Sequence, residues 1–208
     1  MKVLCFIPYA RLESEVVNAV LAQEGVEYFD IWFANDNPWT DEVRGVYKNM
    51  QYAYEKMRQI VLREGYEAVW IVESDTVPPK DALKKLLDLN VPVASGLYVL
   101  RHGASVPNVR DGGGSMPWAH IKKWWGQTVE ITGGCMGCLL VRKEVLKDFC
   151  MVDLTDLRAP DGRFMAYCNE KRIKQVGHLG VICGHIRPNG EILIPDKDKG
   201  YRVEKRAA

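Results

Sequence analysis

Two carboxylates stand directly after a short apolar run near the middle of the chain. Residues 68–72 read Ala-Val-Trp-Ile-Val, and Glu73 and Asp75 follow, two positions apart. Such a run predicts a strand buried on both faces of a sheet, and open α/β sheets bind ligands at the carboxyl ends of their strands. Side chains two apart on an extended chain point to the same side, so these acids would repel each other without a cation between them. The pair therefore predicts a site for a hard divalent ion such as Mg²⁺ or Mn²⁺.

The same residues have a simpler interpretation as helix caps. Pro78 and Pro79 lead into a helical pattern, and Asp and Ser are ordinary capping residues before such a pattern. A capping role would need no metal. The wholly apolar strand before Glu73 favours the metal site, because ligand sites in α/β folds follow such strands.

The elements that must position these residues alternate along the first hundred residues. The apolar patterns predict strands at 2–7, 28–34, 68–72 and 91–100, and helices at 13–25, 43–65 and 80–89. Such an order predicts an α/β fold with a mostly parallel central sheet, right-handed crossovers and helices on both faces. After residue 100 the rhythm changes: residues 108–118 predict a mobile loop and residues 126–132 an isolated strand.

Composition narrows the class of protein. A chain of 208 residues, 47% of them apolar, can form one well-packed core and does not demand two domains. A net charge of +1 gives no argument for a nucleic-acid partner. Pro8 and Arg11 interrupt the apolar start before a signal peptide could form, and no stretch approaches the ~20 apolar residues of a membrane span. We expect a cytoplasmic protein whose six cysteines are thiols.

Four segments, in order, resemble the GT-A class of nucleotide-sugar glycosyltransferases. Glu-Ser-Asp followed by a proline turn resembles the Asp-x-Asp motif of that class, with Glu73 in place of its first Asp. The others are a glycine-rich acceptor-side segment (132–146), an acidic segment opening a helix (160–177) and a terminal strand with a histidine (181–190). The similarity spans about residues 2–190 and is closest to small family-two-like enzymes of archaeal, bacterial and viral type.

The resemblance implies a single GT-A (Rossmann-like) domain over residues 1–195. Its nucleotide- and metal-binding half would span residues 1–100, and its acceptor-side half residues 101–195. Residues 196–208 would form a charged C-terminal tail. The implied activity is metal-dependent transfer of a sugar from a nucleotide-diphosphate sugar to a hydroxyl acceptor, with inversion. The acceptor would be a glycan, a lipid or a protein.

The resemblance also implies the metal ligands. Asp75 would bind Mn²⁺ or Mg²⁺ directly, and Glu73 would be a second ligand or contact the ribose. His185 would be the third ligand, since Mn²⁺ also accepts an imidazole. Considered alone, His185 would more often be a structural histidine.

Asp161 is the candidate catalytic base. It matches the acid that stands three residues before an aromatic in the family, here Phe164, and an inverting transfer needs a carboxylate to take the acceptor's proton. Asp161 could instead cap a helix that begins near Arg163. Asp153 and Asp156 are the nearest rivals for the role of base.

Nucleotide contacts are expected after the first two strands. Pro8, Tyr9 and Arg11 follow strand one, and Asp36 follows strand two, although its neighbours also read as a plain turn. Ser74, between the two acids, completes this predicted set. Arg58, on the long helix, could bind a phosphate or belong to a solvated face.

Two further patterns leave alternatives open. Cys135 and Cys138 form a Cys-x-x-Cys, but no second pair has zinc spacing, so buried thiols are favoured. The tryptophans at 118, 124 and 125 follow a glycine run at 112–114, and they could form a lid over bound donor, a membrane-surface contact or the core of a flap.

Two rival functions remain. A nucleotidyltransferase would be expected to carry a glycine-rich loop after strand one, and residues 7–13 contain no glycine. A non-catalytic nucleotide-sugar-binding protein would lack a base and a metal ligand, for both of which the chain has candidates.

Overall fold

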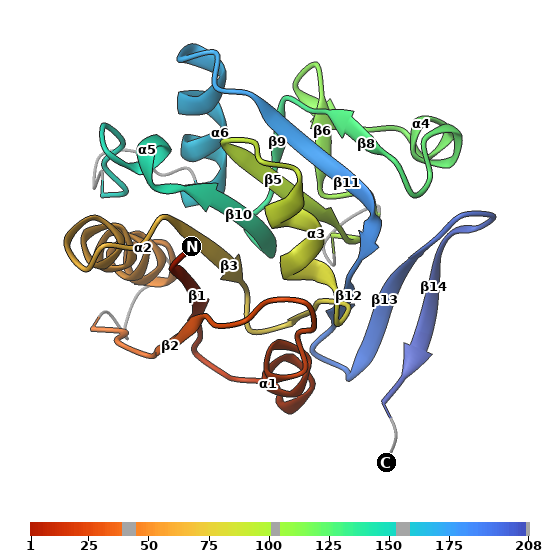
Figure 1. Cartoon of the computed structure of the whole chain (residues 1–208). Helices are drawn as coiled ribbons and strands as arrows, with labels where there is room; N and C mark the ends of the chain where they lie inside the picture. The colour runs from red at the N-terminus through yellow and green to blue at the C-terminus, as the bar shows by residue number, and fades with distance from the viewer. Residues whose placement is uncertain (39–44, 101–104, 153–158, 207–208) are drawn as a thin grey trace.

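The centre of the protein is a seven-stranded sheet, seen in a computed structural model that describes residues 1–38, 45–100, 105–152 and 159–206 (Figure 1). The strand order is β2-β1-β3-β10-β5-β11-β8. β10 is antiparallel to both neighbours and β8 is antiparallel to β11, so five of the seven strands run in one direction. This confirms the mostly parallel sheet. The strands are β1 (Val3–Pro8), β2 (Asp30–Ala34), β3 (Ala68–Val72), β5 (Val93–Leu97), β8 (Thr128–Glu130), β10 (Cys138–Arg142) and β11 (Gln175–Ile182).

Helices cover both faces of this sheet, as expected. α2 (Gly45–Arg63), α5 (Lys143–Leu146) and α6 (Pro160–Glu170) pack on one face, and α1 (Ser14–Leu21) and α3 (Ala82–Asp88) pack on the other. Strand β3 shows why: Val69 and Ile71 enter the first core, while Trp70 and Val72 enter the second. Each of these side chains is fully buried, and such burial stabilises the fold by about 1.5–3 kcal/mol per large apolar residue.

Strand β5 is shorter than the predicted strand at 91–100. After Leu97 the chain leaves the main sheet, and Tyr98 and Leu100 instead form backbone hydrogen bonds with Asn108 and Val106. This second pairing brings the segment after β5 to the mouth of the site described below.

Residues 108–118 do not form the expected loop. β6 (Val109–Asp111) and β7 (Gly114–Ser115) form a hairpin, and β6 also pairs with β9 (Gly133–Gly134). The two turn residues, Gly112 and Gly113, have φ of 60° and 96°, the backbone that tight hairpin turns require and that glycine adopts freely. The expected isolated strand at 126–132 is also wrong, because β8 pairs with β11.

A second, four-stranded sheet contains the C-terminal region, in the order β14-β13-β12-β4. Its strands are β4 (Thr76–Val77), β12 (Gly184–Ile186), β13 (Glu191–Asp196) and β14 (Gly200–Lys205). Residues expected as a charged tail thus pair with β13 along the length of β14. Arg206, just beyond β14, lies 2.6 Å from Glu13 and 2.9 Å from Glu15, so the end of the described chain is tied to α1.

Within the described ranges, no helix combines the length and apolar character needed to cross a membrane. α2, with 19 residues, carries several charged side chains, among them Lys56, Arg58 and Arg63.

Candidate active site

A cavity of about 700 Å³ opens where β1, β2 and β3 end. Seven of the ten predicted site residues line it, so the structure brings together most of the residues that the sequence proposed separately. The seven are Pro8, Tyr9, Glu73, Ser74, Asp75, Asp161 and His185.

Pairing between β4 and β12 brings Asp75 and His185 together. His185 lies opposite Thr76 in the ladder, and the backbone N–H of Ile186 donates to the Asp75 carbonyl at 2.8 Å. As a result, His185 Nε2 lies 3.4 Å from Asp75 Oδ1, although 110 residues separate the two in sequence.

The His185 ring is held in one orientation. Its Nδ1 lies 2.7 Å from the Val99 carbonyl, which can only accept, so Nδ1 carries the proton and donates it. The Tyr98 ring meets the imidazole edge-on, with centroids 5.2 Å apart. In the neutral ring, the lone pair of Nε2 then faces the Asp75 carboxylate. Histidine ligands of metals are held in this way, with the second nitrogen bonded to a carbonyl or carboxylate.

This donor set fits a hard divalent ion with few protein ligands. Neighbouring ligands of an octahedral ion with bonds of about 2.1 Å lie about 3 Å apart, close to the observed separation of Asp75 and His185. Among the described residues, no three His, Cys, Asp or Glu side chains form a complete metal-binding group, so Glu73 does not join the other two as expected. Mg²⁺ and Mn²⁺ often take their other ligands from water and substrate phosphates.

Glu73 and Asp75 reach the cavity by a turn. The backbone N–H of Thr76 donates to the Glu73 carbonyl at 3.0 Å, which closes a turn directly after β3. We expected Glu73 and Asp75 to share one side because they are two apart on an extended chain. Both do line the cavity, but the turn places them there, not a continuing strand.

Three carboxylates converge around one buried hydroxyl. Burial raises the pKa of Tyr54 well above 10, and the negative charges of Glu73, Asp161 and Asp75 raise it further. The hydroxyl therefore keeps its proton, and it lies 3.5 Å from Glu73 Oε1. Neighbouring carboxylates repel one another, and a cation placed among them lowers that repulsion.

Asp161 is in the first turn of α6 and is not its cap. The N-cap is Ala159, Pro160 begins the helix, and Asp161 Oδ1 accepts from the backbone N–H of Gly162 at 2.7 Å. The interpretation of Asp161 as a cap before Arg163 is therefore wrong. The rival bases Asp153 and Asp156 lie outside the described residues.

Cys135 is the neighbour of Asp161 in the cavity wall. Burial first, and then the Asp161 carboxylate, raise the pKa of the Cys135 thiol to about 12, and the positive charge of Arg110 opposes the shift. The thiol is therefore protonated and donates to Asp161. Cys138 points elsewhere, into the core beside Cys183, which confirms the interpretation of the Cys-x-x-Cys as buried thiols.

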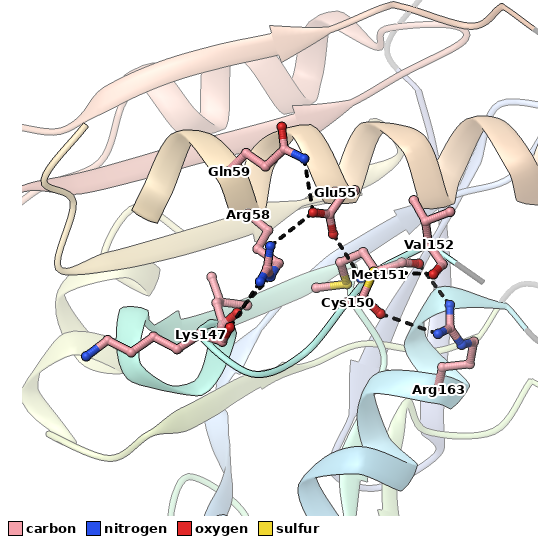
Figure 2. Close-up of polar contacts among 9 residues, drawn as sticks. Glu55, Arg58, Gln59, Lys147, Cys150, Met151, Val152 and Arg163 are labelled. Atoms are coloured by element: carbon pink, nitrogen blue, oxygen red, sulfur yellow. Dashed lines mark hydrogen bonds and ion pairs between the residues drawn. The ribbon is translucent and has the colours of Figure 1, made fainter. Parts of the chain in front are cut away.

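Three predicted contact residues do not line the cavity. Arg11 is exposed and pairs with Glu13 at 3.2 Å, and Asp36 is exposed and pairs with Lys56. Arg58 belongs neither to a phosphate site nor to a solvated face. Its Nε donates to the Leu146 carbonyl at 2.8 Å, its Nη2 to the Lys147 carbonyl at 3.0 Å and its Nη1 to Glu55 at 3.0 Å (Figure 2). Arg58 thus holds α2 to the segment after α5.

The three tryptophans also lie away from the cavity lining. Trp118, in α4 (Trp118–Lys123), and Trp125 pack on a small core beside β11, and Trp124 is 40% exposed. Trp118 also packs against Gly200 at the tip of the β13–β14 hairpin. Their packing matches the core of a flap better than a lid over bound donor.

Several lining residues were missed in the sequence. Tyr98 follows a buried strand, and Tyr54, which is buried behind the lining rather than part of it, belongs to the apolar stripe of α2, so both resemble ordinary core residues. Asn37 joins the loops after β1 and β2 by donating to the Tyr9 carbonyl at 3.2 Å. Arg110 lies in the segment predicted as a loop; a two-residue Gly-Gly turn after Asp111 was the signal that could have revealed its hairpin.

No family model and no curated protein sequence matches the chain. Among solved structures, the fold is similar to the crystal structure of A197 from STIV, with a TM-score of 0.64 and 14% sequence identity. The match covers 100% of this chain and 96% of that one. At this level of identity the similarity establishes a shared fold: an α/β protein with a mostly parallel central sheet and additional antiparallel sheets.

Proposed function

We propose that this protein is a metal-dependent glycosyltransferase of the GT-A type, which moves a sugar from a nucleotide-diphosphate donor to a hydroxyl acceptor with inversion. One observation carries the proposal. Asp75 and His185 face each other at 3.4 Å at the carboxyl ends of the strands, in the same cavity as the carboxylate of Asp161. Donor binding at this edge of the sheet is typical of α/β folds.

The donor nucleotide would lie over the ends of β1 and β2. Pro8 and Tyr9 line that end of the cavity together with Asn37 and Tyr47, and Ser74 lies between the two acids. Tyrosine rings provide stacking surfaces for a base, and the Asn37 side chain already holds the first two loops together.

Asp75 and His185 would hold Mn²⁺ or Mg²⁺ beside the donor diphosphate. Such an ion, when bound, neutralises the charge that develops on the leaving diphosphate oxygen. The Val99 carbonyl keeps the Nε2 lone pair of His185 available for this role.

Asp161 would act as the base. As the acceptor oxygen bonds to the anomeric carbon and the bond to the diphosphate breaks, the hydroxyl proton passes to the Asp161 carboxylate, and the bonding electron pair leaves with the diphosphate. The Gly162 N–H and the Cys135 thiol hold that carboxylate in place. Its position in the first turn of α6 also suits a negative charge.

Thermal shift with nucleotides and Mn²⁺ tests the proposal. A ligand that binds only the folded protein raises its melting temperature, so a nucleoside diphosphate should raise it more with Mn²⁺ than without. We expect one of UDP, GDP, ADP or CDP to do so, and Asp75→Asn to remove the Mn²⁺-dependent part. Equal shifts with and without Mn²⁺, or none with any nucleotide, would count against the proposal. Metal-dependent binding without sugar transfer or donor hydrolysis would favour a non-catalytic binding protein.

A further inference from the structure

Arg110 lines the cavity and comes from a different part of the fold than the predicted nucleotide loops. It lies on β6, which Figure 1 shows across the main sheet from β1 and β2. Among the described residues that line the cavity, Arg110 is the only arginine or lysine, and it shares the wall with Glu73, Asp75 and Asp161.

The Nε–H of Arg110 has no hydrogen-bond partner although it is buried. A buried donor without a partner costs free energy, so native proteins seldom keep one unless a ligand or water satisfies it. The edge formed by Nε and one Nη is the edge that binds carboxylates and phosphates with two parallel hydrogen bonds. Arg58 shows the opposite case, because its Nε and both Nη atoms all have partners.

The surroundings of Arg110 place it on the side of the base. The Cys135 thiol feels the charges of Asp161, Arg110 and Glu73, so Arg110 lies near the base in the shared cavity wall. In an inverting displacement the base and the leaving group lie on opposite faces of the sugar ring. An anion bound by Arg110, next to the base, would therefore be a different group from the leaving diphosphate, which would lie near Asp75 and His185.

We propose that Arg110 binds a carboxylate or phosphate group carried by the transferred sugar or by the acceptor, next to the attacking hydroxyl. This inference rests on the proposed function. One of the two substrates would then carry an acidic group near Asp161. Neutral analogues would bind less well, because they would leave the guanidinium edge of Arg110 unpaired.

Matched neutral and acidic probes test the anion site itself. Binding of glucuronate, glucose and inorganic phosphate is measured by titration for the wild type, Arg110→Gln, Arg110→Lys and Arg63→Gln. The last variant removes the same charge from an exposed surface pair and serves as the control. We expect the wild type and Arg63→Gln to prefer glucuronate over glucose at least tenfold, and Arg110→Gln to lose that preference. Arg110→Lys keeps the positive charge and the aliphatic part of the side chain. We therefore expect it to fold and to retain part of the preference for glucuronate over glucose.

A second pair of probes identifies which substrate carries the anion. UDP-glucuronate is compared with UDP-glucose in the presence of Mn²⁺, and glucuronate is titrated into the protein saturated with UDP and Mn²⁺. A preference for UDP-glucuronate that depends on Arg110 assigns the anion to the transferred sugar, and added binding of glucuronate assigns it to the acceptor.

Two results would overturn the inference. One is the absence of any acidic preference with every probe, and the other is a tenfold loss of UDP–Mn²⁺ affinity in Arg110→Gln, which would assign Arg110 to the diphosphate. If no nucleotide binds the wild type, the proposed function fails, and glucuronate and phosphate alone still decide whether Arg110 is an anion site.

Discussion

Two clusters of charged residues involve side chains of α2, and they are built in opposite ways. Beneath the helix, Glu55 accepts hydrogen bonds from Arg58, Gln59 and the Met151 N–H, and Arg163 donates to the carbonyls of residues 150 and 151 (Figure 2). In the cavity, the negative charges of Glu73, Asp75 and Asp161 all act on the Tyr54 hydroxyl instead. The first cluster pairs opposite charges, as structural contacts do, whereas the second brings three carboxylates together, an arrangement common at functional sites.

Asp161→Asn should have the largest effect. Asparagine keeps the size of the side chain and can still accept from the Gly162 N–H, but it cannot take a proton. We expect kcat and kcat/KM to fall together by ~100- to 10,000-fold, with donor and Mn²⁺ affinity unchanged. Transfer assays, or donor hydrolysis if the acceptor is not identified, measure the rate. A rate near that of the wild type would assign the base to Asp153 or Asp156 or indicate a retaining mechanism.

Asp75→Asn should weaken Mn²⁺-dependent nucleotide binding strongly. Loss of a group that merely supports a metal ligand costs about 10- to 100-fold in affinity, and loss of a direct ligand should cost at least as much. Titration calorimetry with the nucleoside diphosphate, with and without Mn²⁺, measures this. Glu73→Asp is the matched comparison: it restores the residue usual in the GT-A motif and should have the milder effect. Undiminished Mn²⁺ dependence in Asp75→Asn would remove Asp75 from the site.

Glu55→Gln should affect stability and leave ligand binding intact. The Glu55 side chain is 14% exposed and accepts several hydrogen bonds, so removing its charge leaves Arg58 uncompensated. We expect the free energy of unfolding to fall by about 2 kcal/mol, measured by urea denaturation. Glu64→Gln, at an exposed pair with Arg63, is the control and should change it by at most about 0.5 kcal/mol. A change in nucleotide affinity in Glu55→Gln would break the distinction between the two clusters.

Tyr54→Phe should have the smallest effect at neutral pH. Its bond to Glu73 is long, 3.5 Å, so we expect a loss of about 1 kcal/mol or less. Because the pKa of Tyr54 is raised on folding, its contribution is fully present below pH ~10, the unfolded value, and is lost as the pH rises further. Stability should therefore fall less steeply above pH ~10 in Tyr54→Phe than in the wild type. Equal slopes would show that the hydroxyl titrates normally.

The sequence predicted well those elements whose burial is periodic. Residues 68–72 are a strand with the predicted bounds because both of its faces are buried, and α2 follows from the spacing of Tyr54, Met57 and Val61. The hairpin β6–β7 was missed because its strands are only three and two residues long, too short for an alternating pattern to appear. β8 was thought isolated because its partner, β11, begins 45 residues after β8 ends (175 − 130).

The candidate site was predictable where a residue stands at the end of a predicted strand or helix and less so elsewhere. Asp75 and Asp161 stand at the ends of predicted elements, and both line the cavity. Tyr54 was missed because the sequence does not distinguish a tyrosine whose hydroxyl meets a carboxylate, as that of Tyr54 meets Glu73, from an ordinary core aromatic. Arg58 was expected either to bind a phosphate or to lie on a solvated face, because the carbonyls of Leu146 and Lys147, its actual partners, lie 88 and 89 residues away in sequence.

The position of β10 between β3 and β5 determines when the central sheet can form during synthesis of the chain. A ribosome makes residues 68–97 first, yet these two strands do not pair with each other: each pairs with residues 138–142, which emerge later. β12, which carries His185 to Asp75, follows later still. A nascent chain presents both side chains only after residue 185 has been made, so Asp75 and His185 come together late in the synthesis of the described fold.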